Sequence, residues 1–219
     1  MRLIIPTILT KHLMKHCFLI LLIDVAWPMT SFAQGNTVES IRQTYADVRQ
    51  HINQMMNDEW PREYYHIDTY ENLPATGPQK EDIYMYYGFI EGNEEDIYIP
   101  HYLQFLTMKY NYSIREFYEE YLYDKKGNLL FFFVQSPDII DDKVSQVRAW
   151  FDGQRLLRFA VSETDFNYYT NNPKDSMQFK QIYAGTTVPE TYNGIFQHRK
   201  NMAKTYLEMF NAVDNVVQY

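Results

Sequence analysis

A chain of 219 residues with 46% hydrophobic side chains is long enough for one domain and too apolar for an intrinsically disordered protein. Its formal net charge is −8 and it has no Lys/Arg-rich run, so we expect no nucleic-acid binding, because phosphate neutralisation supplies most of that affinity. The aromatic share of 17% includes 20 Tyr, whose apolar rings and polar tips suit a sheet with one wet face or a binding surface.

The first 33 residues have the three parts of a secretory signal peptide. Lys11 and Lys15 form a positive region, residues 17–27 form an apolar core, and Ser-Phe-Ala at 31–33 is a small-x-small cleavage site. The apolar run is roughly half of the about 20 residues that a membrane anchor needs, so we expect no stable membrane insertion after cleavage. Residues 1–33 are therefore predicted to be a signal peptide, and the protein to be periplasmic or secreted.

Two details of this segment bear on the mature chain. Met14 is a second suitable initiator, so the sequence leaves open whether translation begins there or at Met1. Cys17 opens the apolar core instead of closing it, which argues against a lipoprotein signal. Because it is the single cysteine and is removed with the signal, the mature chain, residues 34–219, is expected to have no disulfide and no thiol chemistry.

A helix is predicted at the start of the mature chain. Asn36 or Thr37 is a suitable N-cap, and Glu39 lies in the first turn. Apolar residues then recur every three or four positions and share one helical face: Val38, Ile41, Tyr45, Val48, Ile52 and Met55. The stripe is under three heptads long, which favours packing on the protein's own domain over a coiled coil.

The centre of the chain has the pattern of an antiparallel meander, because short runs rich in Tyr, Phe, Val and Leu alternate with turn clusters. A Pro/Gly-rich turn at 73–78 separates the first two runs, and Gly127 and Gly153 mark two hairpins. The run 129–134 has no polar face, which predicts a strand covered on both sides. About seven strands are expected, at residues 64–70, 82–90, 102–112, 117–123, 129–134, 144–151 and 154–161.

Beyond these strands the pattern weakens. Residues 165–176 have loop composition, and Pro189 opens a final helix at a position that Pro tolerates. The elements are segregated in the order helix, strands, helix, and do not alternate. We therefore predict the α+β class: an antiparallel meander sheet of about seven strands with an N-terminal and a C-terminal helix packed on it, in a single domain spanning residues 34–219.

The sequence contains no family motif for catalysis. It has no Gly-rich phosphate loop, and none of the four histidines of the mature chain (His51, His66, His101 and His198) has a second His at metal-ligand spacing. We therefore assign no catalytic residue and expect no cofactor and no metal. His66 and Asp68 are two apart on one predicted strand, so their side chains point the same way and form a candidate ligand-binding or acid/base pair. The consecutive Glu119 and Glu120 point to opposite faces, which argues against a paired-carboxylate glycosidase site.

Tyrosines on adjacent predicted strands form the other candidate site. Exposed Tyr platforms bind sugars and peptides, but Tyr also packs well within sheets, so both roles stay open. The period of two places Tyr102, Tyr110 and Tyr112 on one face of the third strand. The candidate ligand-binding tyrosines are Tyr84, Tyr86, Tyr102, Tyr110 and Tyr112.

The signal peptide, the early helix, the Leu-Pro-Ala-Thr-Gly turn at 73–77 before a Tyr-rich strand, and the Gly-containing hairpins resemble uncharacterised exported bacterial proteins of unknown function. The resemblance covers most of the mature chain and implies no active site. We expect a secreted or periplasmic non-enzymatic binding protein that holds a glycan, peptide or protein ligand on an aromatic sheet face. Two alternatives stay open: a hydrolase that uses carboxylates and His66, and a structural envelope protein that self-associates through its sheet, for example as a homodimer.

Export provides the first testable prediction. Because residues 31–33 close an apolar core of adequate length, we expect cleavage before Gln34. The intact mass of the protein purified from its native host should correspond to a chain that begins at Gln34. Recovery of an uncleaved N-terminus in the membrane fraction would contradict this prediction.

Overall fold

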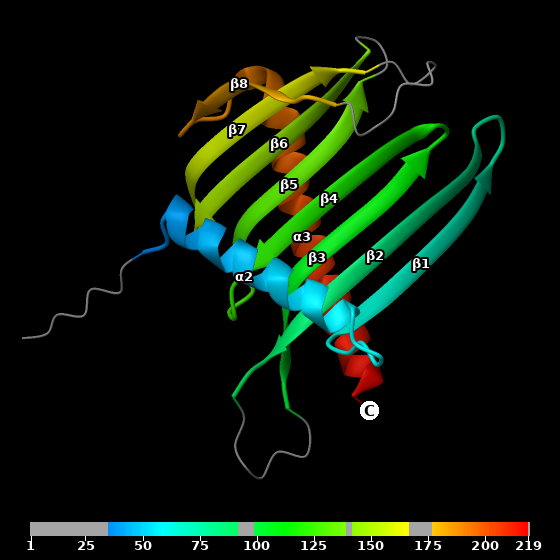
Figure 1. Cartoon of the computed structure of the whole chain (residues 1–219), viewed down its shortest axis with the longest axis vertical. Helices are drawn as coiled ribbons and strands as arrows, with labels where there is room; N and C mark the ends of the chain where they lie inside the picture. Colours follow the sequence, from blue (N-terminus) through cyan, green and yellow to red (C-terminus); the bar gives the residue numbers. More distant parts are fainter. Residues whose placement is uncertain (1–34, 92–98, 139–141, 167–176, 219) are drawn as a thin grey trace, which may run out of the picture. The chain divides into compact units, whose positions relative to one another are not determined.

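Eight antiparallel strands follow one another in chain order across a single sheet (Figure 1). A computed structural model of the protein describes residues 35–91, 99–138, 142–166 and 177–218. The predicted signal peptide lies outside these residues. The strands are β1 (Tyr64–Leu73), β2 (Gly77–Phe89), β3 (His101–Tyr112), β4 (Arg115–Tyr123), β5 (Leu129–Asp138), β6 (Lys143–Asp152), β7 (Arg155–Asp165) and β8 (Lys180–Gly185).

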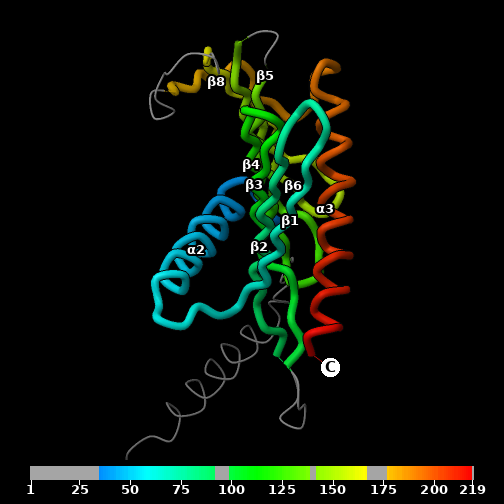
Figure 2. Tube along the Cα trace, turned by 90° about the vertical axis from the view of Figure 1, so that its right-hand side faces the viewer, coloured from blue at the N-terminus to red at the C-terminus, as the bar shows by residue number. Residues whose placement is uncertain are grey.

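Two helices cover opposite faces of the sheet, as Figure 2 shows. α2 (Val38–Met56) precedes β1, and α3 (Glu190–Val217) follows β8, so the predicted α+β class with two packed helices is confirmed. Thr37 is the cap of α2: its hydroxyl accepts from the Ser40 backbone N–H at 3.1 Å, and the Ser40 hydroxyl oxygen accepts from the Thr37 N–H at 2.9 Å. Neither helix, the two in the described part of the chain, is long and apolar enough to cross a membrane.

Alternating side chains give the sheet two cores, because successive residues of a strand point to opposite faces. Phe132 and Val134 are fully buried in the core under α3. Phe131 and the partly buried Phe133 belong to the core under α2. All four lie in β5, which was predicted to be covered on both sides. That prediction is confirmed, and the cover comes from two helices of the same chain.

The sheet has one strand more than the sequence pattern predicts. β8 pairs with β7 and forms one edge of the sheet. Lys180, Gln181 and Ile182 are all exposed. Tyr183 packs on the core, with its ring centre 6.2 Å from that of Phe159. An edge strand with so little buried surface has no hydrophobic period that its sequence could reveal.

Phe132→Ala is expected to lower the free energy of unfolding by about 3–5 kcal/mol, the usual cost of deleting a buried Phe side chain. Phe132 is 0% exposed and packs against Phe151 and Phe196. Denaturant melts measure the loss, with Tyr70→Ala as a control because Tyr70 is 66% exposed on β1. A loss below about 1 kcal/mol for Phe132→Ala, ordinary for surface changes, would contradict the prediction.

Candidate functional site

β4 carries two consecutive buried glutamates. Glu119 is 0% exposed and Glu120 is 4% exposed, and carboxylates are almost never so buried unless they are paired. Their side chains point to opposite faces of the sheet, as the sequence period predicts. Glu119 pairs with a residue of α3 and Glu120 with residues of α2. The two carboxylates therefore belong to two separate clusters.

The cluster around Glu119 lies between α3 and the sheet. One carboxylate oxygen is 2.5 Å from Arg199 Nη1 and accepts from the Tyr110 hydroxyl at 3.0 Å, and the other accepts from the Tyr121 hydroxyl at 2.6 Å. Burial alone would lower the pKa of Arg199, but attraction to Glu119 and the neighbouring tyrosines outweighs it and the pKa is raised. Burial, followed by the charge of Glu119, raises the pKa of Tyr110 to about 12. These bonds fasten α3 to the sheet.

On the other face, Glu120 meets two tyrosine hydroxyls and one guanidinium, and we call Tyr45, Arg49, Tyr118 and Glu120 the Glu120 cluster. Tyr45 from α2 donates to Oε2 at 2.7 Å, and Tyr118 donates to Oε1 at 2.7 Å. Arg49 Nη1, one turn further along α2, lies 3.5 Å from Oε1. Burial raises the pKa of both tyrosines, and Glu120 raises it further. Both tyrosines therefore remain protonated hydrogen-bond donors at neutral pH.

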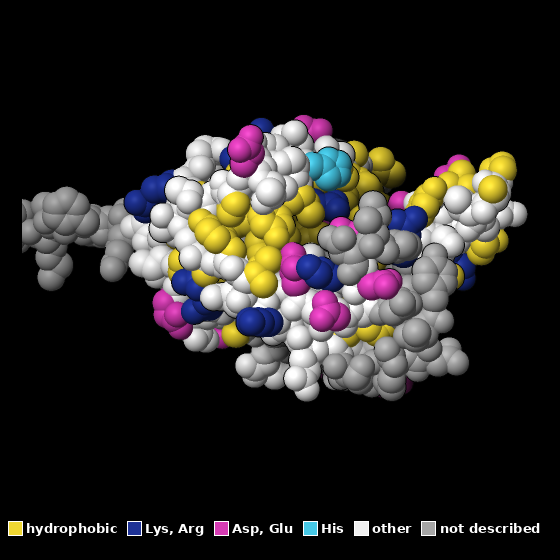
Figure 3. Space-filling view, turned by 90° about the horizontal axis from the view of Figure 1, so that it is seen from above, with side chains coloured by type: hydrophobic (Ala, Val, Ile, Leu, Met, Phe, Trp, Pro, Cys, Tyr) yellow, Lys and Arg dark blue, Asp and Glu magenta, His cyan; other side chains and the backbone are white. Residues whose placement is uncertain are grey.

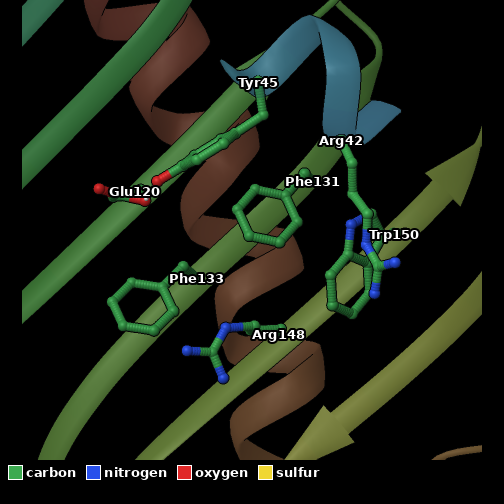
Figure 4. Close-up of a pocket in the computed structure, with 7 residues that line it drawn as sticks. All are labelled: Arg42, Tyr45, Glu120, Phe131, Phe133, Arg148 and Trp150. Atoms are coloured by element: carbon green, nitrogen blue, oxygen red, sulfur yellow. Dashed lines mark hydrogen bonds between the residues drawn. The ribbon is translucent and has the colours of Figure 1, made fainter. Parts of the chain in front are cut away.

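A pocket of about 300 Å³ lies beside this cluster, and we call it the α2 pocket (Figure 4). Aromatic rings form most of its wall, and three charged side chains complete it. Such a lining, largely apolar with a few fixed polar groups, is typical of small-molecule sites. The lining residues come from four elements: Arg42 and Tyr45 of α2, Glu120 of β4, Phe131 and Phe133 of β5, and Arg148 and Trp150 of β6.

Arg148, which lines the α2 pocket, differs from Arg49 and Arg199 of the two clusters in the direction of its pKa shift. Its guanidinium lies over the ring of Phe133, 4.9 Å from the ring centre, and donates to Gln146 Oε1 at 2.6 Å. Burial is the largest effect on Arg148 and lowers its pKa. Burial acts on Arg49 too, but the attraction of Glu120 and nearby tyrosines reverses the direction, and the pKa of Arg49 is raised.

A second pocket, of about 330 Å³, adjoins the Glu120 cluster, and we call it the Tyr84 pocket. Arg49 and Tyr118 line this pocket, whereas Tyr45 and Glu120 line the α2 pocket. The hydrogen-bonded cluster is therefore a shared wall between two adjacent pockets. The full lining of the Tyr84 pocket is Arg49, Asp82, Tyr84, Tyr86, Thr107, Lys109 and Tyr118.

Three of the predicted ligand-binding residues lie together here. Tyr84 and Tyr86 line the Tyr84 pocket, and His66 stacks on Tyr84 with ring centres 4.1 Å apart. His66 Nε2 also lies 3.5 Å from an Asp82 oxygen. Asp68 is the partner of Asp82 in the register of β1 and β2, and it is exposed. Across the described ranges, no three His, Cys, Asp or Glu side chains form a group that could hold a metal ion.

The predicted common face of Tyr102 and Tyr110 is wrong, because a bulge interrupts β3. Gln104 pairs with no residue of β2, so the register of the two strands shifts there. The residues before Gln104 therefore face the opposite side of the sheet from the one that a period of two predicts. Leu103 consequently joins the core under α3, on which Tyr110 also packs. Tyr102 therefore faces the other side of the sheet.

Tyr102, Tyr110 and Tyr112 line neither pocket. The ring of Tyr102 lies so close to Gly88 that a Cβ there would be 2.6 Å from it, and glycine makes room for the ring. Tyr112 is 39% exposed near the end of β3, with the Arg115 guanidinium 5.0 Å from its ring centre.

Sequence analysis did not single out the α2 pocket. Arg148 and Trp150 share one face of β6 by the period of two, together with Gln146. A charged residue on the covered side of an internal strand was the available signal, but nothing in the sequence shows that α2 ends up beside it.

Comparisons of the chain with protein-family models, with curated proteins and with solved structures find no match. The case for function therefore depends on the geometry of the two pockets.

The raised pKa values of Tyr45 and Tyr118 make stability depend on alkaline pH. A tyrosine with a raised folded-state pKa keeps its proton when the unfolded chain loses it. Its stabilising contribution is complete below about pH 10 and is lost as pH rises through the folded-state pKa. In denaturant melts from about pH 8 upward, the free energy of unfolding should fall above about pH 10 by up to about 1.4 kcal/mol per pH unit for each such tyrosine.

The double variant Tyr45→Phe/Tyr118→Phe should have a shallower alkaline slope than the wild type. Tyr70→Phe is the matched control, because this side chain is 66% exposed and is solvated in both states. Equal slopes in the wild type and the double variant would show that the two hydroxyls do not respond to folding.

Proposed function

We propose that the protein is an exported, non-enzymatic binding protein whose ligand occupies the α2 pocket and reaches the adjoining Tyr84 pocket. The observation that carries the proposal is the α2 pocket itself, where aromatic rings and a half-buried guanidinium surround a cavity of small-molecule size. The acidic group beside it, Glu120, already has its donors within the protein. Its neighbours are thus held in place before any ligand arrives.

The neighbouring tyrosines support a ligand longer than one pocket. The ring centres of Tyr84 and Tyr86 are 6.1 Å apart, and the ring of Tyr64 lies 5.9 Å from that of Tyr84. Rows of aromatic rings offer flat apolar faces with polar tips, which suit sugar rings and peptide side chains. A glycan or short peptide that spans the Glu120 cluster would contact both pockets.

The two alternative functions have less support. His66, which the hydrolase alternative would use, lines neither pocket, and its partly exposed side chain lies 3.5 Å from the Asp82 carboxylate. A structural protein that self-associates through an apolar sheet face would need that face uncovered. The central strand β5 instead packs under α2 on one face and under α3 on the other.

The fluorescence of Trp150 can report ligand binding in the α2 pocket, because Trp150 lines that pocket. The chain has three tryptophans, of which Trp60 is 77% exposed and Trp27 lies in the predicted signal peptide. In the full-length protein, Trp27→Phe with Trp60→Phe leaves Trp150 as the single tryptophan, in the wall of the α2 pocket. Ligands found on glycan and peptide arrays with the wild type should shift or quench its emission on titration.

The matched control carries Trp27→Phe and Trp150→Phe, which leaves Trp60 as the reporter. Its emission should not respond to the same ligand. Arrays without any bound glycan or peptide, or a response confined to Trp60, would overturn the assignment of the binding site.

A further inference from the structure

The unneutralised charge of Arg148 indicates what the α2 pocket binds. Arg199 and Arg49 lie against Glu119 and Glu120 respectively. Within the described residues, no ion pair joins Arg148 to an acidic side chain, and its hydrogen bond goes to the neutral Gln146. Burial penalises its charge, as the lowered pKa indicates. Because Arg148 is half-buried and forms no ion pair within the described residues, its guanidinium is a natural partner for an anion.

The negative charge of Glu120, which lines the same pocket, also acts on Arg148. Glu120 is engaged by two hydroxyls and faces Arg49. Arg42, the second guanidinium of the pocket, lies 5.5 Å from the ring centre of Trp150 and forms an exposed pair with Glu39 at 3.5 Å. Exposed pairs of this kind are weak, so Arg42 adds positive charge to the site. On the face seen from above, by contrast, basic and acidic side chains lie next to one another (Figure 3).

The rings around Arg148 define the rest of the ligand. Figure 4 shows its guanidinium between the rings of Phe133 and Trp150, with Phe131 further along the same wall. Flat apolar surfaces of this kind pack against rings. A volume of about 300 Å³ is at the lower end of the range for small-molecule sites, which limits the buried part of the ligand to one or two rings.

We infer that the ligand of the α2 pocket is a ring-bearing carboxylate whose acid group pairs with Arg148 and whose ring packs on Phe131, Phe133 and Trp150. One planar guanidinium matches the two oxygens of a carboxylate, and stacking on a ring leaves free the N–H groups that do not donate to Gln146. An aromatic acid and an acidic sugar share this chemistry. The inference rests on the proposed function, because it names the ligand class of the same pocket.

The test uses five probes that differ in charge or in ring: phenylacetate, phenylacetamide, phenyl phosphate, glucuronate and glucose. Each is titrated against the full-length protein with Trp150 as its single tryptophan. At least one carboxylate should bind about tenfold or more tightly than its neutral counterpart, the usual effect of a charge-assisted hydrogen bond. Tighter binding of phenylacetate assigns the aromatic acid, and tighter binding of glucuronate assigns the acidic sugar.

Arg148→Gln should abolish the preference for the carboxylate over the neutral probe. Arg155→Gln is the matched control: it removes the same charge from the β6–β7 hairpin, where Arg155 is 68% exposed and pairs with Asp152 at 2.8 Å. This variant should keep the full preference. Arg148→Lys keeps the charge but lacks the planar guanidinium, so it should retain part of the preference for the carboxylate. If circular dichroism shows that Arg148→Gln does not fold, the Arg148→Lys variant provides the test.

Equal affinities for charged and neutral probes, or tightest binding of phenyl phosphate, would overturn the carboxylate assignment. So would a preference that survives Arg148→Gln, or no response of Trp150 to any probe. The array experiment decides the proposed function separately, since a neutral glycan or peptide that acts on Trp150 would support it without supporting the carboxylate.

Discussion

Two neighbouring carboxylates on β4 govern the arrangement of this molecule. A buried carboxylate needs donors at fixed positions, because an unpaired charge in the interior is costly. Glu119 is paired with Arg199 of α3, and Glu120 with Tyr45 and Arg49 of α2. Since adjacent residues of a strand point to opposite faces, one dipeptide holds one helix on each side of the sheet. A register slip of one residue would turn each carboxylate away from its donors.

The same constraint shapes the proposed binding site. Tyr45 and Arg49 hold α2 over the sheet, and together with Tyr118 they satisfy Glu120. Because this cluster stands between the α2 pocket and the Tyr84 pocket, the residues that position the helix also divide the site. In the α2 pocket, the guanidinium of Arg148 has a hydrogen bond to the neutral Gln146 but no ion pair within the described residues. The polar groups that hold α2 on the sheet are therefore different from the guanidinium that we propose selects the ligand.

Much of the fold could be predicted from local patterns. The apolar run in β5 implied cover on both faces, and Gly127 and Gly153 occupy the positive-φ positions (78° and 59°) that their hairpins require. β8 escaped prediction because an exposed edge strand has no hydrophobic alternation. The faces of β3 were mispredicted because the bulge at Gln104 depends on pairing with β2, which is not visible in β3 alone.

The site was less accessible to sequence reasoning than the fold. Tyr84 and Tyr86 were two of the five candidate tyrosines on adjacent strands, and the structure places both in one pocket. The α2 pocket draws its residues from four separate elements. Only the docking of α2 brings Arg42 to Trp150 and Tyr45 to Glu120. The spacing of residues within a single element does not predict contacts between different elements.

The meander also has a consequence for the order in which the protein folds. Each strand pairs with its neighbour in the chain, so sheet formation brings together segments that are close in sequence and can proceed hairpin by hairpin. Distant segments meet mainly through the helices: Tyr45 bonds to Glu120 across 75 residues, and Tyr65 bonds to Asp214 across 149. The large aromatic surface on the α3 side stays open to water until that helix docks. Docking of α3 thus closes the larger core and joins segments that are much farther apart in sequence than paired strands are.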